Sequence, residues 1–161
     1  MQERKYLKIS NDIFFEQVLL CLKENKKVKM FVQGNSMFPF LWNGDEVLLS
    51  PAQPKTLKRG DIVLAKTEIG IILHRIIRLK EDLVVLAGDG NVNQVEHAFL
   101  NEVYAIVQCG YRNDSSWNVS STYQKLLWLL WRFFRPLRRL LIPIIKTITK
   151  QHTQNNYENK R

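Results

Sequence analysis

The sequence predicts one mainly β domain with a helix at each end. Between residues 28 and 112, short runs rich in Val, Ile and Leu alternate with Gly, Pro, Asn and Asp, which is typical of strands joined by turns. Residues 11–25 and 123–150 instead carry apolar side chains at helical spacing. With 161 residues, 45% of them hydrophobic and 24% charged, the chain is long enough for one domain with a core and short for two.

The elements are expected in the following order. An amphipathic helix covers residues 11–25, where Asn11 or Asp12 can cap it. Strands follow at residues 28–32, 46–49, 61–66, 69–79, 83–87 and 102–108. The polar, turn-rich segment 112–116 is expected to be a linker at the edge of the domain.

Beyond this segment the chain is strongly basic. Residues 115–161 contain nine Lys and Arg against one acidic residue, whereas residues 1–114 are nearly neutral, with 15 Lys and Arg against 14 Asp and Glu. Residues 126–145 would be long enough to span a membrane, but they contain four arginines, and each central Arg costs roughly 2.5 kcal/mol or more. We therefore expect a basic amphipathic helix over residues 117–150, and a disordered tail over 151–161.

This helix predicts a partner. With Trp128, Trp131 and Phe133 inserted and its arginines on anionic headgroups, it would lie on an anionic membrane surface. Packing on the domain or on a partner protein is the alternative. The many bulky aliphatic side chains argue against nucleic acid as the partner. No secretory signal is expected after Met1, so the predicted location is peripheral, at the cytoplasmic face of a membrane, with the side left open.

The cysteines are uninformative about chemistry. Cys21 and Cys109 lack metal-type spacing and cannot form a disulfide framework, although a single bridge stays open. We expect each to be a small buried apolar residue. Nothing in the sequence predicts a cofactor or a metal.

The first candidate for chemistry is Ser36, in the turn sequence Gly34-Asn35-Ser36-Met37-Phe38-Pro39. A serine hydroxyl is a poor nucleophile unless a base takes its proton and donors stabilise the oxyanion. Gly34 permits a tight turn in which backbone N–H groups point at a developing negative charge. Taken alone, an ordinary turn serine is the simpler interpretation.

Two further residues complete a set. His74 interrupts the apolar run 70–77, and histidine ordinarily titrates where a general base must work at neutral pH. Asp89 lies in Gly88-Asp89-Gly90-Asn91. A core histidine and a hairpin turn are the structural alternatives for these two.

Together the segments resemble the signal peptidase and LexA-like repressor superfamily of serine peptidases. The matching segments, all within residues 30–108, are Gly34-x-Ser36-Met37-x-Pro39 with Gly44-Asp45, Gly60-Asp61-Ile62-Val63, His74-Arg75-Ile76 and Gly88-Asp89-Gly90-Asn91. Leader peptidases of bacteria and LexA-like repressors have a lysine where this chain has His74. The histidine is similar to the endoplasmic-reticulum and spore-former type of signal peptidase.

The resemblance implies a fold and a mechanism. The fold is a signal-peptidase/LexA-like β-fold (α+β), with the N-terminal helix in residues 1–29 and the catalytic domain in 30–112. The activity is that of a serine endopeptidase in which Ser36 attacks the peptide carbonyl, His74 moves the proton and Asp89 orients the imidazole. The subgroup uses a second acid a few residues on, and here the register gives Val95 and then Glu96, which leaves that role open.

The neighbours of Ser36 receive roles by the same resemblance. The backbone N–H groups of Ser36 and Asn35 would form the oxyanion hole, and the substrate would add as a strand beside the site. Met37 and Phe38 would bind substrate, with a place in the core as the alternative.

The expected substrate is a peptide or pre-protein whose leader or signal segment is cleaved near a membrane. Only 35 residues precede Ser36, and they contain no Ala-Gly or Cys-Gly pair, which argues against a self-cleaving repressor. A non-catalytic peptide-binding module and a LexA-like regulatory protein remain the alternatives.

Overall fold

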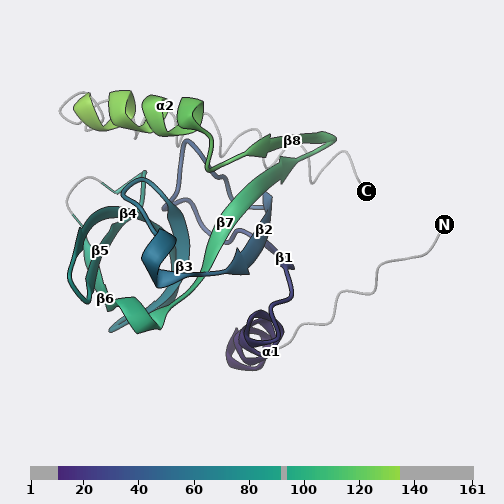
Figure 1. Ribbon diagram of the computed structural model, residues 1–161. Helices are drawn as coiled ribbons and strands as arrows, with labels where there is room; N and C mark the ends of the chain where they lie inside the picture. The colour runs from purple at the N-terminus through teal and green to yellow at the C-terminus, as the bar shows by residue number, and fades with distance from the viewer. Residues whose placement is uncertain (1–10, 92–93, 135–161) are drawn as a thin grey trace.

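The computed structural model describes residues 11–91 and 94–134, which form a mainly antiparallel β half-barrel with an N-terminal and a C-terminal helix (Figure 1). This confirms the predicted mainly β, α+β class. Two single-turn 3₁₀ helices, Pro54–Thr56 and Leu100–Glu102, interrupt the connections. The helices and strands, in chain order, are α1 (Asn11–Lys23), β1 (Val28–Phe31), β2 (Glu46–Pro51), β3 (Ile62–Thr67), β4 (Gly70–Lys80), β5 (Leu83–Ala87), β6 (Glu96–Phe99), β7 (Val103–Arg112), β8 (Ser115–Asn118) and α2 (Thr122–Phe133).

The strands form one curved sheet in the order β1-β2-β7-β3-β4-β5-β6, with β8 paired to β7. Every pairing is antiparallel. The predicted strands correspond to β1–β5 and β7, whereas β6 and β8 were not predicted. The segment expected to be a linker is instead the turn of the β7–β8 hairpin, where Asn113 takes the left-handed conformation (φ 51°).

The core lies on both faces of β3. Ile62 and Leu64 belong to one apolar cluster, which includes residues of α1, and Val63 and Ala65 belong to a second cluster beneath β5 and β6. All four side chains are at most 1% exposed. This double burial explains why β3 is a continuous apolar run rather than an alternating one.

The two helices lie on opposite sides of the half-barrel (Figure 1). α1 packs against β1, β2 and β7. α2 begins at Ser121, whose side chain accepts a hydrogen bond from the backbone N–H of Gln124. Of the predicted C-terminal helix, residues 122–133 are helical here, and its continuation beyond residue 134 lies outside the described residues, as do the predicted tail and residues 1–10.

Within the described ranges, neither helix is long and apolar enough to cross a membrane.

Candidate active site

Ser36 lies in a loop that is closed at its base. The Val32 N–H donates to the Asp45 carbonyl (2.7 Å) and the Gly44 N–H donates to the Val32 carbonyl (2.9 Å). The Arg112 guanidinium holds the Asp45 carboxylate through two hydrogen bonds of 2.7 Å. The Gly44-Asp45 pair noted in the sequence therefore fastens both ends of the loop to the sheet.

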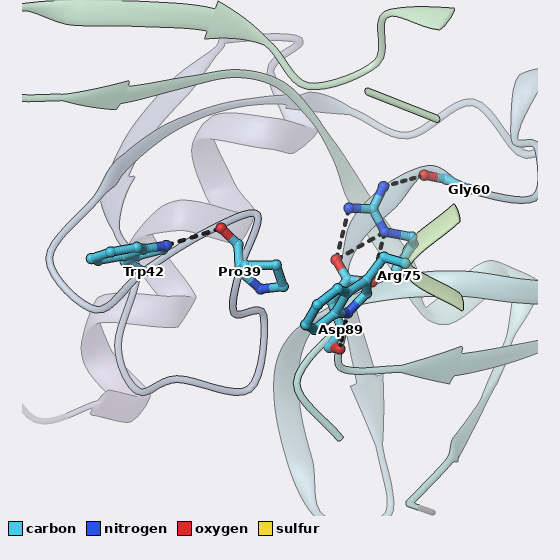
Figure 2. A network of polar contacts seen from close by, with 6 residues as sticks. Pro39, Trp42, Gly60, Arg75 and Asp89 are labelled. Atoms are coloured by element: carbon cyan, nitrogen blue, oxygen red, sulfur yellow. Dashed lines mark hydrogen bonds and ion pairs between the residues drawn. The ribbon is translucent and has the colours of Figure 1, made fainter. Parts of the chain in front are cut away.

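The interior of the loop is held from within. Gly34 has φ +80°, a conformation that favours glycine, and its N–H donates to the Asn43 side chain (2.9 Å). The indole N–H of Trp42 donates to the Pro39 carbonyl (2.9 Å; Figure 2). Leu41, at 0% exposure, anchors the turn in the core. Ser36 is half-buried on this turn, which hydrogen bonds and a buried leucine hold in shape.

The second glycine-rich segment, residues 88–91, packs directly on this turn. The Gly90 N–H donates to the Ser36 carbonyl (2.8 Å). A Cβ atom on Gly88 would lie 2.5 Å from the same carbonyl oxygen, and a Cβ on Gly90 would lie 3.0 Å from the Asn35 carbonyl oxygen. Both glycines are needed because the two backbones meet here, and side chains would separate them.

His74 forms a buried pair with Glu96. Its Nδ1 atom lies 2.9 Å from Glu96 Oε2, and the two side chains are 6% and 5% exposed. Because Nδ1 is engaged by the carboxylate, Nε2 is the ring nitrogen left to serve a hydroxyl group.

The strand register places His74 next to Gly88, the residue that contacts the Ser36 backbone. Arg75 on β4 is paired with Ala87 on β5, so His74 and Gly88 both lie next to this pair. Gly88 is in contact with the Ser36 backbone. No hydrogen bond joins the Ser36 hydroxyl to His74 among the described residues.

Asp89, which was predicted to orient His74, forms an ion pair with Arg75. Its carboxylate accepts hydrogen bonds from Arg75 Nε (3.0 Å to each oxygen) and Nη2 (2.7 Å), and Arg75 Nη1 donates to the Gly60 carbonyl (2.7 Å; Figure 2). The side chains of Arg75 and Asp89 are 1% and 2% exposed. The carboxylate that orients Nδ1 of His74 is that of Glu96, whereas Asp89 neutralises a buried guanidinium.

α2 lies over these segments and holds them. The indole N–H of Trp131 donates to the Asp89 carbonyl (2.9 Å), and Lys125 forms an ion pair with Asp61 (2.7 Å). Trp128, at 4% exposure, packs so closely on Gly60 that a Cβ there would lie 3.3 Å from its ring. The two tryptophans predicted to enter a membrane therefore face the domain instead.

Three backbone donors in the turn around Ser36 are unused. The N–H groups of Asn35, Ser36 and Met37 donate to no other group of the described residues, although those of Gly34 and Phe38 do donate. Donors of this kind are what an oxyanion hole requires.

Met37 and Phe38, which were predicted to bind substrate or to lie in the core, are both buried. They are 1% and 5% exposed, and Met37 belongs to the core cluster that includes α1. They point into the domain because the turn at Ser36 is held by apolar anchors on its inner side. The core alternative is the one that the structure supports.

Glu96 is the residue whose role as a second acid the sequence left open. It lies on the short strand β6, whose side chains alternate between buried and exposed, so Glu96 and Ala98 point inward. Its Oε1 is the fully buried side-chain oxygen that has no hydrogen-bond partner within the described part of the chain. A buried carboxylate with an unsatisfied oxygen is costly, which favours a chemical reason for its presence over a structural one.

No model of a known protein family matches this chain, and no curated protein matches it.

Proposed function

We propose that this chain is a serine endopeptidase of the signal-peptidase type, with a signal-peptidase/LexA-like β-fold, and that it cleaves a leader or signal segment of a peptide or pre-protein near a membrane. Ser36 is the nucleophile, His74 the general base and Glu96 the orienting carboxylate. The observation that carries this proposal is the fastening of the Ser36 turn to the 88–91 segment, directly beside the buried His74–Glu96 pair.

The chemistry follows from these positions. His74 Nε2 takes the proton of the Ser36 hydroxyl as its oxygen attacks the peptide carbonyl, and Glu96 stabilises the imidazolium through Nδ1. The N–H groups of Asn35 and Ser36 stabilise the oxyanion. The proton then passes to the leaving amine, and a water molecule, deprotonated by His74 in its turn, releases the acyl group from Ser36.

The sheet offers a place for an extended substrate. β1 is an edge strand, paired only with β2, and it leads into the Ser36 loop. The first residues of β4, from Gly70 to Leu73, pair with β3 but have no partner on β5. A peptide that adds as a strand at either edge is led toward Ser36 and His74.

One observation favours a second candidate, a non-catalytic peptide-binding module. Ser36 and His74 share no hydrogen bond among the described residues. Catalytic hydrogen bonds are often long in the absence of substrate and tighten when it binds, so we keep the peptidase as the first candidate.

The test is a comparison of protein N-termini by mass spectrometry in cells that carry the wild-type chain, Ser36→Ala or the control Ser116→Ala, which alters an exposed serine on β8. N-termini that need Ser36 but not Ser116 give the substrate and its cleavage rule. An unchanged set of N-termini, with Ser36→Ala folded and expressed, would refute the peptidase and leave the binding module.

A further inference from the structure

A basic groove of about 570 Å³ lies beside α2, and no residue of the Ser36 loop lines it. Cross-strand pairing places Arg78 on β4, Val85 on β5 and His97 on β6 in one row along its floor. Arg59, from the turn before β3, and Arg132, from α2, also line it. The rest of its lining is apolar.

Two of the arginines that line this groove, Arg59 and Arg78, offer their positive charge to a ligand. None of the described residues that line it is acidic. Arg59 and Arg78 are exposed, and neither forms an ion pair within the described ranges. Exposed guanidinium groups that converge on one groove attract an anion, and phosphate is the group that their planar fork suits best.

The outward face of α2 adds an apolar surface next to the groove. Its exposed fractions are 55% for Leu126, 45% for Leu129, 49% for Leu130 and 79% for Phe133. Leu129 lies one helical turn before Arg132, so the apolar face borders the groove directly. The inward face of α2 is occupied by its contacts with the domain.

We propose that the groove and the outward face of α2 together form one docking surface for an anionic phospholipid bilayer. The exposed leucines and Phe133 enter the acyl boundary, while Arg59 and Arg78 bind the phosphate groups of lipids at the rim. Nucleic acid would use the arginines but would leave the large apolar face in water. The protein side chains that enter the lipid in this proposal differ from those expected from the sequence. Trp128 and Trp131 were expected to enter it, but both contact the domain.

This docking surface contains none of the residues assigned to peptide cleavage, and the proposal does not rest on that activity. Ser36→Ala must therefore bind membranes as the wild-type chain does, even if peptide cleavage is never found. It also makes the catalytic domain itself, through Arg59 and Arg78, part of the contact with the membrane.

The experiment is flotation of the purified full chain with vesicles of phosphatidylcholine alone or of phosphatidylcholine with phosphatidylglycerol. The wild-type chain should float only with the anionic vesicles, and salt should weaken this binding. Arg59→Glu/Arg78→Glu should bind more than about tenfold more weakly, given the usual contribution of each basic residue near such a surface. Leu129→Ser/Phe133→Ser tests the apolar half in the same way.

The matched control is Lys23→Glu/Lys27→Glu, which makes the same change in net charge at the α1 end of the molecule (Figure 1). It should bind nearly as the wild type does. The basic residues after position 134 are present in every variant, so the comparison isolates the groove. Equal binding by the groove variant and the wild type would overturn the proposal. So would a wild-type chain that does not bind anionic vesicles but binds a DNA duplex through Arg59 and Arg78.

Discussion

His74 Nδ1 lies 2.9 Å from Oε2 of Glu96, in a pair that is almost fully buried. A buried pair of this kind contributes little to stability, because the cost of removing both groups from water offsets their attraction. It does fix the orientation of the imidazole, and it directs Nε2 away from the carboxylate. We therefore infer that the pair serves catalysis, by orienting the imidazole, more than it serves stability.

Glu96→Gln should reduce peptide cleavage much more than it reduces stability. Glutamine keeps the shape of the side chain and can still accept a hydrogen bond from Nδ1, but it cannot stabilise an imidazolium. The rate constant kcat should fall by about 10²–10⁴-fold, as when the acid of a serine-protease triad is made neutral. Steady-state kinetics on the substrate identified from protein N-termini, with thermal unfolding beside them, would check this. A variant with undiminished kcat would remove Glu96 from the mechanism.

Asp89→Ala should act mainly on stability. It leaves the guanidinium of Arg75 buried without its carboxylate, and breaking one side of a buried ion pair costs about 3–5 kcal/mol. The control Asp114→Ala alters an exposed acid in the β7–β8 turn and should stay within about 0.5 kcal/mol of wild type. Denaturant unfolding of both variants measures the loss of stability that follows if Asp89 neutralises Arg75. In the role predicted from the sequence, Asp89 orients His74, and its loss would lower activity in a protein that stays stable.

Local patterns predicted much of the fold because they depend on nearby residues. β5 has the predicted bounds, since an apolar run between two turns defines it. β6 has only four residues, two of them polar, and it is a strand because Leu83–Leu86 pair with it. β8 likewise is a strand because it pairs with β7. A polar turn between them is also what the end of a domain looks like in sequence, so residues 112–116 were predicted to be a linker.

The candidate site divides in the same way. Gly34, Gly88 and Gly90 could be recognised from sequence because their conformation or close packing needs glycine. The carboxylate that contacts His74 could not be recognised from sequence, because the contact depends on the register between β4, β5 and β6. Asp89 is closer to His74 in the sequence than Glu96 is, so it was the natural candidate for the carboxylate that orients the imidazole. Its pairing with Arg75 can be seen only in the folded structure.

Gly88→Ala should be more disruptive than Gly90→Ala. The new methyl group would lie 2.5 Å from the Ser36 carbonyl oxygen in the first variant and 3.0 Å from the Asn35 carbonyl oxygen in the second. Neither partner is a flexible side chain, so the backbone must shift, at about 1–3 kcal/mol for overpacking of this kind. Unfolding free energies give the order of the two variants. The reverse order would show that the two loops do not meet as described.

Trp131→Phe should loosen the Asp89 segment without unfolding the domain. It removes the indole N–H that donates to the Asp89 carbonyl, and an ordinary hydrogen bond contributes about 0.5–1.5 kcal/mol. Because Gly88 and Gly90 are in contact with Ser36 from the same segment, the loss should be felt at the serine turn. Hydrogen exchange should become faster at residues 88–91 and 35–38, and remain unchanged in β2 and β7.

The matched control is Tyr123→Phe, which removes an exposed hydroxyl group from the first turn of the same helix. That hydroxyl group forms no hydrogen bond with the described residues, so its loss leaves the contact of Trp131 with the Asp89 carbonyl in place. If Tyr123→Phe alters exchange at residues 35–38 as much as Trp131→Phe does, the effect is general destabilisation. A change confined to Trp131→Phe would mean that α2 supports the serine turn through Asp89, so that any partner of its outward face acts on a helix already coupled to the candidate active site.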